Sequence, residues 1–349
     1  MTSPDLRQQL ANITRSILSE ELDFLDLKNG LDRFKDLCLQ ATGIDLESDA
    51  ASEYIKLDSG KAIGPRWAGM CIEDLLRTRR FQMGVLKAVT TLLDKQQEPI
   101  QILYAGTGPF ATLVLPLISL FSSEQIQFTL LEVNPVSFEN VKLLFRRMQA
   151  EDYLANTLQC DASEVKLKAP ELFDIVVIEC LQHKLEREPQ VAITQNLLSQ
   201  LREDVVLIPE DISLYVSYIN MSARNEQMMS GSTGSKKDYY RLANPIFRLN
   251  KKTTYEMSNG NGQLEPGFPE EYTEIAKQDK KPGMSLAIAT EIRVFDDELL
   301  QMDDCGLTVP NIIADLDHAG YDLNGLHTRY VLGNHPGLRI EFSREACDK

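Results

Sequence analysis

The stretch that decides the fold class is Gln101-Ile102-Leu103-Tyr104-Ala105-Gly106-Thr107-Gly108-Pro109-Phe110. It reads as an apolar strand that runs into a Gly-x-Gly turn. Glycines at such a turn let the backbone reverse sharply and approach a bound ligand closely. From residue 100 onward, strand-like and helix-like patterns alternate. This alternation predicts a parallel, doubly wound α/β sheet.

The same pattern organises the chain on both sides of this stretch. We predict strands over residues 100–105, 128–133 and 174–179, with helices over 111–121 and 137–150. Upstream, apolar residues at helical spacing predict a mainly helical region, interrupted by a Gly- and Pro-containing loop at residues 59–67. Downstream of Pro209, alternating runs such as residues 212–219 predict antiparallel strands. The expected domains are an N-terminal helical region (1–95), a Rossmann-like domain (96–209) and a β-rich domain (210–349) with a long insertion at about 220–283.

Bulk composition excludes some classes of partner. The 349 residues exceed the usual length of one domain, and 43% hydrophobic residues with 25% charged residues are ordinary globular values. The net charge of −16 and the pI of about 4.8 argue against nonspecific binding to nucleic acid or to an anionic membrane. An acidic surface is compatible with a cationic substrate.

The cysteine pattern and the N-terminal residues are the features that bear on the cellular compartment. No C-x-x-C motif occurs, so we expect reduced thiols rather than a disulfide framework or a metal site. The first residues lack the pattern of a secretory signal, and no apolar run reaches the length of a membrane span. We therefore expect a cytoplasmic protein. The cysteines are Cys38, Cys71, Cys160, Cys180, Cys305 and Cys347.

Acidic residues lie at the ends of two further predicted strands, residues 128–133 and 157–162. Glu132 ends one strand, where a carboxylate can hold both hydroxyls of a ribose. Asp161 ends the other, where it can accept a hydrogen bond from an adenine amino group, although it can also cap the following turn. Gly106-x-Gly108-x-x-Ala111 fits the dinucleotide fingerprint too, which keeps a nicotinamide enzyme as a competing interpretation. These features together predict a nucleotide-type ligand.

Two glutamates, Glu179 and Glu188, stand nine positions apart directly after the apolar run 173–178. Paired carboxylates suit a planar guanidinium, which carries five N–H donors in a fixed fork. In an open α/β sheet, ligands bind at the carboxyl ends of the strands. Glu188 also precedes Pro189, so it can simply begin a helix, where a carboxylate favours the positive end of the dipole.

With these residues together, the chain resembles the protein arginine methyltransferases over roughly residues 54–219. Glu132, then Asp161, then an acidic loop is the order found in methyltransferases that use S-adenosylmethionine. The resemblance implies a class I methyltransferase: a Rossmann-like doubly wound sheet with N-terminal helices and a C-terminal β-barrel-like domain. The matching motifs are Asp74-x-x-Arg77-Thr78, Gly106-Thr107-Gly108-Pro109-Phe110, Leu131-Glu132-Val133-Asn134-Pro135, the "double-E" loop from Glu179 to Glu188, and residues 207–216.

The resemblance also implies roles for single residues. Glu179 and Glu188 would bind and activate the guanidino group of arginine, and Arg77 would hold the methionine carboxylate of S-adenosylmethionine. Because the family commonly dimerises, a homodimer is implied. The residues expected to hold the cofactor are Arg77, Gly106, Gly108, Glu132, Asp161 and Ala162.

The chain departs from the family in its acceptor region. The Thr-His-Trp loop that helps to shape the site for peptide arginine is not found, and Trp67 is the only tryptophan. We therefore expect free arginine or a small guanidino compound to be favoured, with residues 64–67 and 333–337 closing the pocket. The alternatives are a protein arginine methyltransferase with a diverged acceptor loop and a noncatalytic scaffold. Tyr104 stands where many methyltransferases have an acidic residue.

Overall fold

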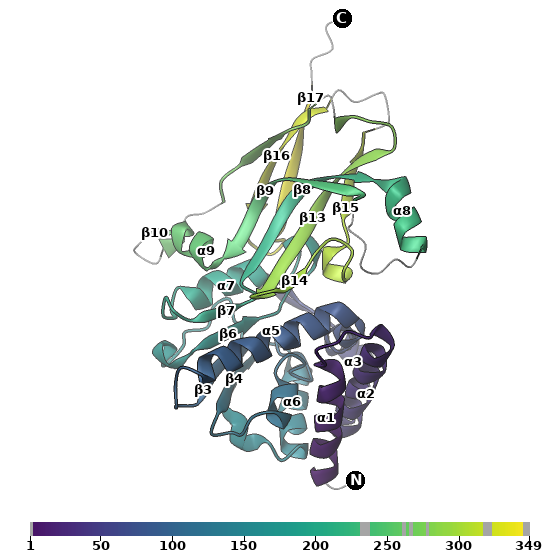
Figure 1. The fold of residues 1–349 in the computed structure, drawn as a ribbon. Helices are drawn as coiled ribbons and strands as arrows, with labels where there is room; N and C mark the ends of the chain where they lie inside the picture. The colour runs from purple at the N-terminus through teal and green to yellow at the C-terminus, as the bar shows by residue number, and fades with distance from the viewer. Residues whose placement is uncertain are drawn as a thin grey trace, which may run out of the picture.

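The computed structural model describes residues 3–230, 238–259, 263–264, 268–276, 279–316 and 323–344. Parts of the predicted insertion and Cys347 lie outside these ranges. Figure 1 shows two halves, one built around a parallel sheet with helices and the other built from long antiparallel strands. No helix within the described ranges is both long enough and apolar enough to cross a membrane.

Five parallel strands form the central sheet of the first half, in the order β5-β4-β3-β6-β7. Because the strands run the same way, their carboxyl ends meet at one edge, and Ala105 lies level with both Leu131 and Ile178. This confirms the predicted Rossmann-like, doubly wound sheet. The strands are β3 (Ile100–Ala105), β4 (Ile126–Glu132), β5 (Leu154–Gln159), β6 (Ile175–Ile178) and β7 (Val206–Ile208).

Helices cover both faces of this sheet. Successive side chains of β3 alternate between the faces, as a strand requires. Ile102 and Tyr104 pack with the core that holds helices α1, α2, α5 and α6, whereas Leu103 and Ala105 pack with α7. The helices are α1 (Ser3–Ile17), α2 (Phe24–Thr42), α5 (Leu75–Leu93), α6 (Pro135–Arg147) and α7 (Gln190–Leu198).

Short elements connect these layers. A hairpin of β1 (Ile55–Leu57) and β2 (Gly60–Ala62) lies in the segment that the sequence predicts as mainly helical. It leads into α4 (Pro65–Met70), whose first turn begins at a proline with a helix-compatible φ. The remaining short helices are α3 (Asp49–Ser52), η1 (Cys71–Glu73), η3 (Glu151–Tyr153), η4 (Pro170–Leu172), η5 (His183–Leu185) and η7 (Gly306–Thr308).

The predicted helix over residues 111–121 is wrong. Turns follow the glycine motif, and the only helical element within this range is the 3-10 helix η2 (Leu115–Ser119). Ala111 has a φ of 44°, and Pro116 has no N–H to donate to an α-helical hydrogen bond. The segment is nevertheless buried, so its apolar character reflects the core rather than a helix.

Two antiparallel sheets of three or more strands form most of the second half. Phe247 of one sheet and Tyr330 of the other stack with ring centroids 4.5 Å apart, and Phe268 packs edge-on against both. The sheets therefore share a core, which confirms the β-rich, barrel-like prediction. One sheet contains β8 (Asp211–Asn220), β9 (Tyr240–Asn250), β13 (Met284–Phe295), β14 (Glu298–Leu300) and β15 (Asn311–Asp315); the other contains β12 (Glu271–Glu274), β16 (Leu323–Val331) and β17 (Gly337–Arg344).

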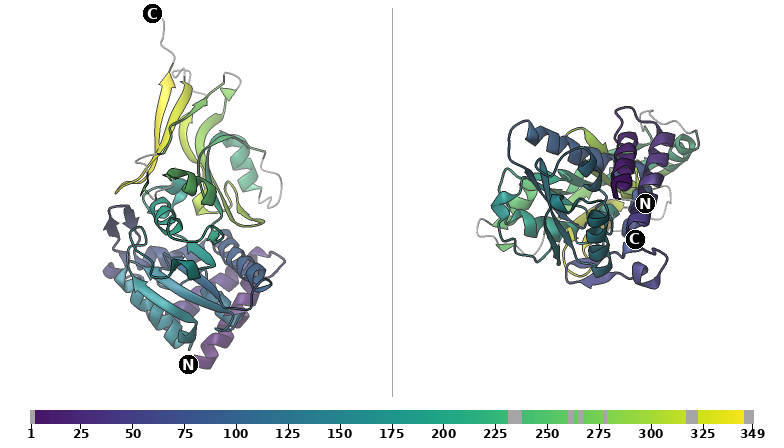
Figure 2. Two further views of the ribbon diagram at one scale, coloured as in Figure 1. Left: turned by 90° about the vertical axis from the view of Figure 1, so that its left-hand side faces the viewer. Right: turned by 90° about the horizontal axis from the view of Figure 1, so that it is seen from below.

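The range predicted as a long insertion contributes to this half. Within it, β9 pairs with β8 along most of its length, as Figure 2 lets the reader follow from the side. The helix α8 (Met221–Met229) precedes β9. Its residue Arg224 forms a bidentate ion pair with the buried side chain of Asp303, which holds the helix in place. The other elements of this range are α9 (Lys251–Met257), β10 (Ser258–Asn259) and β11 (Gln263–Leu264).

Candidate active site

A cavity opens at the carboxyl edge of the parallel sheet. The space between its walls is about 910 Å³, which includes open solvent. The edge where β3 and β6 meet is the place where open α/β sheets bind ligands. Every site residue predicted from the sequence lines this one cavity, namely Arg77, Gly106, Gly108, Glu132, Asp161, Ala162, Glu179 and Glu188.

The glycine turn after β3 is shaped by close packing. Gly106 has a φ of 82° and Gly108 a φ of 57°, both in the left-handed region that glycine tolerates best. A Cβ atom on Gly106 would lie 2.3 Å from the sulfur of Cys180 and 2.8 Å from the carbonyl oxygen of Glu179. Only glycine at this position allows the turn to contact the loop that carries Glu179.

Glu132, the last residue of β4, is held by backbone amides. One carboxylate oxygen accepts from the N–H of Gly108 and the other from the N–H of Asn134, each at 2.8 Å. The side chain is 7% exposed, and burial raises its pKa while these N–H groups oppose the rise. The backbone N–H of Val133 and the side chain of Thr107 lower the pKa in the same way, so this carboxylate is surrounded by hydrogen-bond donors.

Asp161 caps the turn that follows it and also lines the cavity. Its Oδ1 accepts from the backbone N–H of Ser163 at 2.8 Å and from the Ser163 hydroxyl at 2.7 Å, so this oxygen caps the turn. The residue also lines the cavity. The next residue, Ala162, is buried in the cavity wall, and its carbonyl accepts from Asn196 on α7 at 3.0 Å.

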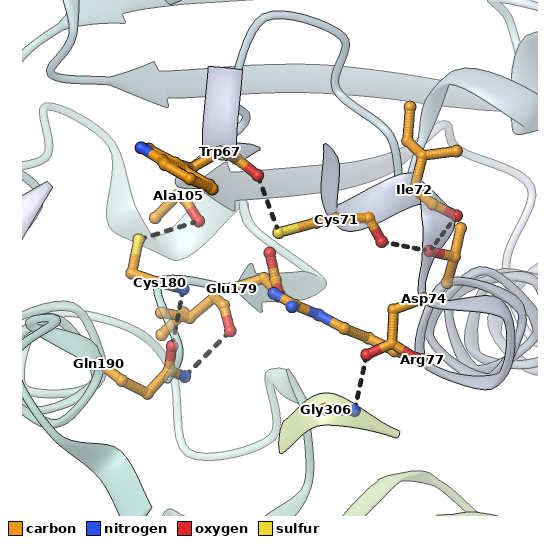
Figure 3. Close-up of polar contacts among 12 residues, drawn as sticks. Trp67, Cys71, Ile72, Asp74, Arg77, Ala105, Glu179, Cys180, Gln190 and Gly306 are labelled. Carbon is orange, nitrogen blue, oxygen red and sulfur yellow. Dashed lines mark hydrogen bonds and ion pairs between the residues drawn. The ribbon is translucent and has the colours of Figure 1, made fainter. Parts of the chain in front are cut away.

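Glu179 already holds a guanidinium, which is that of Arg77. The Nε and Nη2 groups of Arg77 both donate to Oε1 of Glu179, with Nε at 3.0 Å. The two side chains are only 13% and 14% exposed. Burial lowers the pKa of Arg77, but Glu179, Cys71 and Asp74 together outweigh this effect and raise it. Figure 3 shows Arg77 reaching from α5 toward Glu179.

Both partners of this pair are anchored through their backbones. Gln190, at the start of α7, accepts from the N–H of Cys180 and donates to the carbonyl of Ile178, each at 2.9 Å. These bonds bracket Glu179 and are drawn in part in Figure 3. Asp74, the N-cap of α5, accepts from the N–H of Gly306 at 2.9 Å. The first turn of α5, which carries Arg77, is thereby tied to the second half of the molecule.

Glu188 faces the same cavity without a partner. The side chain is 8% exposed, and its carboxylate forms no hydrogen bond or ion pair within the described part of the chain. Burial and the charge of Glu179 raise its pKa to about 7, although Arg77 and Lys61 act in the opposite direction. Glu188 stands just before Pro189, the N-cap of α7; it lies outside the helix, whose first turn has no acidic residue and no side-chain cap.

The loop between the two glutamates is constrained. Lys184, Leu185 and Arg187 all have φ values between 57° and 65°, which side-chain-bearing residues adopt at a cost. Backbone contacts from distant segments fix them: Arg187 accepts from Lys61 at 2.8 Å and donates to Pro336 at 3.1 Å. The hydroxyl of Tyr330 donates to Leu185 at 2.6 Å.

Sequence reasoning missed several residues of the cavity wall. Lys61, Cys71, Tyr104 and Cys180 line it, and only Tyr104 had a sequence signal, as an unusual residue at its position. Burial raises the pKa of Cys71 to about 11 and raises that of Cys180 as well. These thiols therefore stay protonated near neutral pH, which argues against a thiolate nucleophile.

The segments expected to close the pocket contribute little. Trp67 is 52% exposed, and neither it nor residues 333–337 line the cavity, whose wall instead includes the neighbouring Ala62, Ile63 and Ala68. Trp67 lies under the guanidinium of Arg66 on the surface. Across the described ranges, no three His, Cys, Asp or Glu side chains are arranged to hold a metal ion.

Comparisons with known proteins identify the fold. No protein-family model matches the sequence, and no curated protein matches it. The structure is similar to the crystal structure of PRMT6-SAH, with a TM-score of 0.52 and 8% identity, over 78% of this chain and 98% of that one. A structure of protein arginine methyltransferase 10 from Arabidopsis thaliana, described as a uniquely open conformation, covers 78% of this chain and 95% of that one, with a TM-score of 0.45 and 8% identity. The chain has a protein arginine methyltransferase-like fold.

Proposed function

We propose that this protein is an S-adenosylmethionine-dependent N-methyltransferase that acts on the guanidino group of arginine. The observation that carries the proposal is the pair of buried glutamates at one cavity. Glu179 already binds a guanidinium there, and Glu188 has no partner. A buried carboxylate without a partner is costly, so its position favours a role in binding a cationic ligand.

The cofactor proposal rests on the fit of the cavity. Glu132 lines the cavity at the end of β4, where a carboxylate can hold the hydroxyls of a ribose. Asp161 has Oδ2 left for an adenine amino group. Arg77 offers a cation for a carboxylate, and Gly106 and Gly108 keep the turn free of side chains. S-adenosylmethionine supplies an electrophilic methyl group when bound. The similarity to PRMT6-SAH supports the same choice of ligand.

The protein's part in methyl transfer is to position and polarise the acceptor. Positioning alone contributes on the order of 7–11 kcal/mol in well-oriented reactions. Glu179 and Glu188 would accept from separate N–H groups of the guanidinium and favour electron density on the nitrogen that faces the methyl group. Their charges would also offset the positive charge of the acceptor. With a pKa of about 7, Glu188 is suited to take up the proton that the methylated guanidinium loses.

We propose free arginine or a small guanidino compound as the favoured acceptor. Trp67 is exposed and lies outside the cavity wall, so the chain offers no tryptophan at the acceptor site. A protein arginine methyltransferase with a diverged acceptor loop is the second candidate, and a noncatalytic scaffold is the third. The vacant Glu188 carboxylate speaks against a scaffold, because a protein without a ligand gains nothing from keeping it buried.

The remaining sequence-based expectations belong to the same proposal. We propose a cytoplasmic homodimer with domains 1–95, 96–209 and 210–349. The five cysteines in the described ranges are free thiols, as a reducing compartment favours.

The test is incubation of the protein with labelled S-adenosylmethionine and each of three acceptors: free arginine, an Arg-Gly-rich peptide and a small guanidine. Product masses identify the methylated species. We expect free arginine or the small guanidine to be methylated fastest. Faster methylation of the peptide contradicts the small-molecule preference but not the methyltransferase proposal. Tight binding of NADH in calorimetry, with no binding of S-adenosylmethionine, contradicts the proposal as a whole.

A further inference from the structure

We infer that Arg77 is an internal occupant of the acceptor site, and that a guanidine can bind productively only after the cofactor's carboxylate has drawn Arg77 away from Glu179. The inference rests on the proposed function and adds an order of binding to it. Arg77 thereby becomes a positioning residue that links the two ligand sites, in addition to its proposed contact with the cofactor.

The first observation is chemical identity. The group that Glu179 binds is a guanidinium, the same group that the proposed substrate presents. Two N–H groups of Arg77 converge on Oε1 of Glu179, and both side chains are largely buried. An incoming guanidinium therefore finds only Oε2 of Glu179 free of a partner in the described ranges, and not the two oxygens that a fork of two N–H groups binds best.

The second observation is the balance of charge. The described cavity wall contains four carboxylates, of which Glu132 and Asp161 belong to the proposed cofactor site. The other two, Glu179 and Glu188, form the proposed acceptor clamp, and one guanidinium, that of Arg77, lies beside them. Because the pKa of Glu188 is about 7, its carboxyl group is only partly ionised near neutral pH. Lys61 also lines the cavity and acts on Glu188 as a positive charge. A second guanidinium placed beside Arg77 lacks a full negative charge to balance it.

The third observation is that Arg77 has a second place to bind. Its Nη1 group forms no hydrogen bond within the described ranges, so donors remain for a carboxylate. The backbone of the first turn of α5 is fixed by the contact between Asp74 and Gly306 and by the hydroxyl of Thr78, which donates to the carbonyl of Cys71 at 3.0 Å. Only the Arg77 side chain has to turn, and no element has to move.

The consequence is positive coupling between the two ligands. A cofactor whose carboxylate binds Arg77 frees Glu179, so the guanidine binds more tightly. By thermodynamic linkage, bound guanidine raises the affinity of the protein for the cofactor by the same factor. A nucleoside that fills the cavity but lacks a carboxylate leaves Arg77 on Glu179 and produces no coupling.

The test uses ethylguanidine, which has no carboxylate that could bind Arg77 itself. Calorimetry measures its affinity for the protein alone, with S-adenosylhomocysteine, and with methylthioadenosine, which lacks the amino-acid end. We expect affinity to rise about tenfold or more with S-adenosylhomocysteine, within the range usual for coupled sites, and to stay unchanged with methylthioadenosine. Equal affinity in all three states, or an equal rise with both nucleosides, overturns the inference.

Two variants separate coupling from simple charge effects. In Arg77→Gln no guanidinium occupies Glu179 in the absence of ligands. Ethylguanidine should therefore bind this variant tightly, and S-adenosylhomocysteine should not raise its affinity further. Lys61→Gln is the matched control, because it removes a cation from the same cavity without touching Glu179. Lys61→Gln should raise the affinity of ethylguanidine for the protein alone and for both nucleoside complexes. The ratio of the affinities with and without S-adenosylhomocysteine should stay unchanged. An Arg77→Gln protein that retains the full ratio contradicts the inference.

The outcomes distinguish this inference from the proposed function. If guanidines are methylated and the affinity of ethylguanidine is the same with and without S-adenosylhomocysteine, the function stands and the role of Arg77 as internal occupant is wrong. If ethylguanidine binds no form of the protein and no guanidine is methylated, the proposed function is wrong. If Arg77→Gln does not fold, the comparison of the two nucleosides on the natural protein decides the question alone.

Discussion

Two buried glutamates at the same cavity differ in how the fold treats them. Glu132 ends a strand of the parallel sheet, and both of its oxygens accept backbone N–H groups. Glu188 ends a loop of residues with positive φ, and its carboxylate has no partner within the described ranges. Their exposures are nearly equal, at 7% and 8%. Burial alone therefore does not distinguish a carboxylate that backbone N–H groups satisfy from one that has no partner in the described ranges.

The difference between Glu132 and Glu188 shows where the fold contains a buried charge that no partner in the described ranges stabilises. The N–H groups around Glu132 oppose the effect of burial on its pKa, so that side chain is largely satisfied before a ligand binds. Around Glu188 only charges at a distance, from Arg77 and Lys61, oppose it. Proteins commonly give up stability at functional sites. The following predictions use this contrast, beginning with the largest expected effect.

Changing either clamp glutamate to glutamine should give the largest effect. Glu179→Gln and Glu188→Gln keep the shape of the side chain and remove one negative charge from a buried site. Breaking a buried charge pair costs about 3–5 kcal/mol. Turnover of arginine should therefore fall by roughly a few hundredfold or more, at ~1.4 kcal/mol per tenfold. Steady-state assays with labelled S-adenosylmethionine measure this.

Glu186→Gln is the internal control for these variants. Glu186 belongs to the same loop but pairs with Lys184 at 2.9 Å and lies outside the cavity wall. A glutamine there still accepts a hydrogen bond from Lys184, so turnover should stay nearly normal. Near-normal arginine methylation by both Glu179→Gln and Glu188→Gln contradicts the clamp, whatever Glu186→Gln does.

The stability of the isolated protein should reveal the cost of Glu188. The pKa of this group rises from 4.5 in its ordinary state to about 7 in the fold. Between these pH values the folded state binds the proton more tightly, so the stability that this group contributes is lost as pH rises through about 7. At ~1.36 kcal/mol per pKa unit, the loss amounts to about 3 kcal/mol.

Glu188→Gln removes the titrating group and should remove this loss. The variant should resemble the natural protein in its free energy of unfolding near pH 4, and should exceed it by up to about 3 kcal/mol at pH 8. Denaturant titrations at several pH values measure both. A difference that does not change with pH contradicts the assignment of the raised pKa to Glu188.

Much of the parallel half could be predicted from sequence, because strand ends and turns leave local signals. The glycines after β3 and the acidic residue at the end of β4 mark positions that this fold requires. The interaction of Arg77 with Glu179 could not be predicted, since it joins residues 102 positions apart and depends on how α5 sits over the sheet. The sequence pattern also gave a wrong prediction at residues 111–121, where an apolar run that packs in the core was interpreted as a helix.

The second half shows the same limit. The strand predicted from alternation over residues 212–219 lies within β8, whereas β9 lies inside a range that polar and glycine-rich segments made look like an insertion. Its place is set by pairing with β8, a contact between strands that local composition does not encode. The backbone contact that fixes Arg187 against residues 61 and 336 is likewise visible only in the fold.

Glu132→Ala should have a smaller effect, on the cofactor. Loss of a charge-assisted bond to the ribose should weaken S-adenosylmethionine binding by roughly 1–3 kcal/mol. The change also leaves the N–H groups of Gly108 and Asn134 without their acceptor, so thermal stability should fall too. Calorimetry of S-adenosylmethionine measures the first effect. Unchanged affinity in a folded Glu132→Ala protein contradicts the role of Glu132 in the cofactor site.

Trp67→Ala should give the smallest effect. Its side chain is half exposed and does not line the cavity. Turnover and KM for free arginine should therefore stay close to those of the natural protein. A large rise in KM for arginine contradicts this prediction and assigns Trp67 to the acceptor site.

The most direct measurement is the crystal structure of the protein with S-adenosylhomocysteine and arginine bound together. The account predicts that the ligand's guanidinium lies between Glu179 and Glu188, that the ribose hydroxyls lie against Glu132, and that Arg77 contacts the carboxylate of S-adenosylhomocysteine. The contradicting result is an arginine bound elsewhere, with Glu188 still unpaired beside the occupied cofactor site.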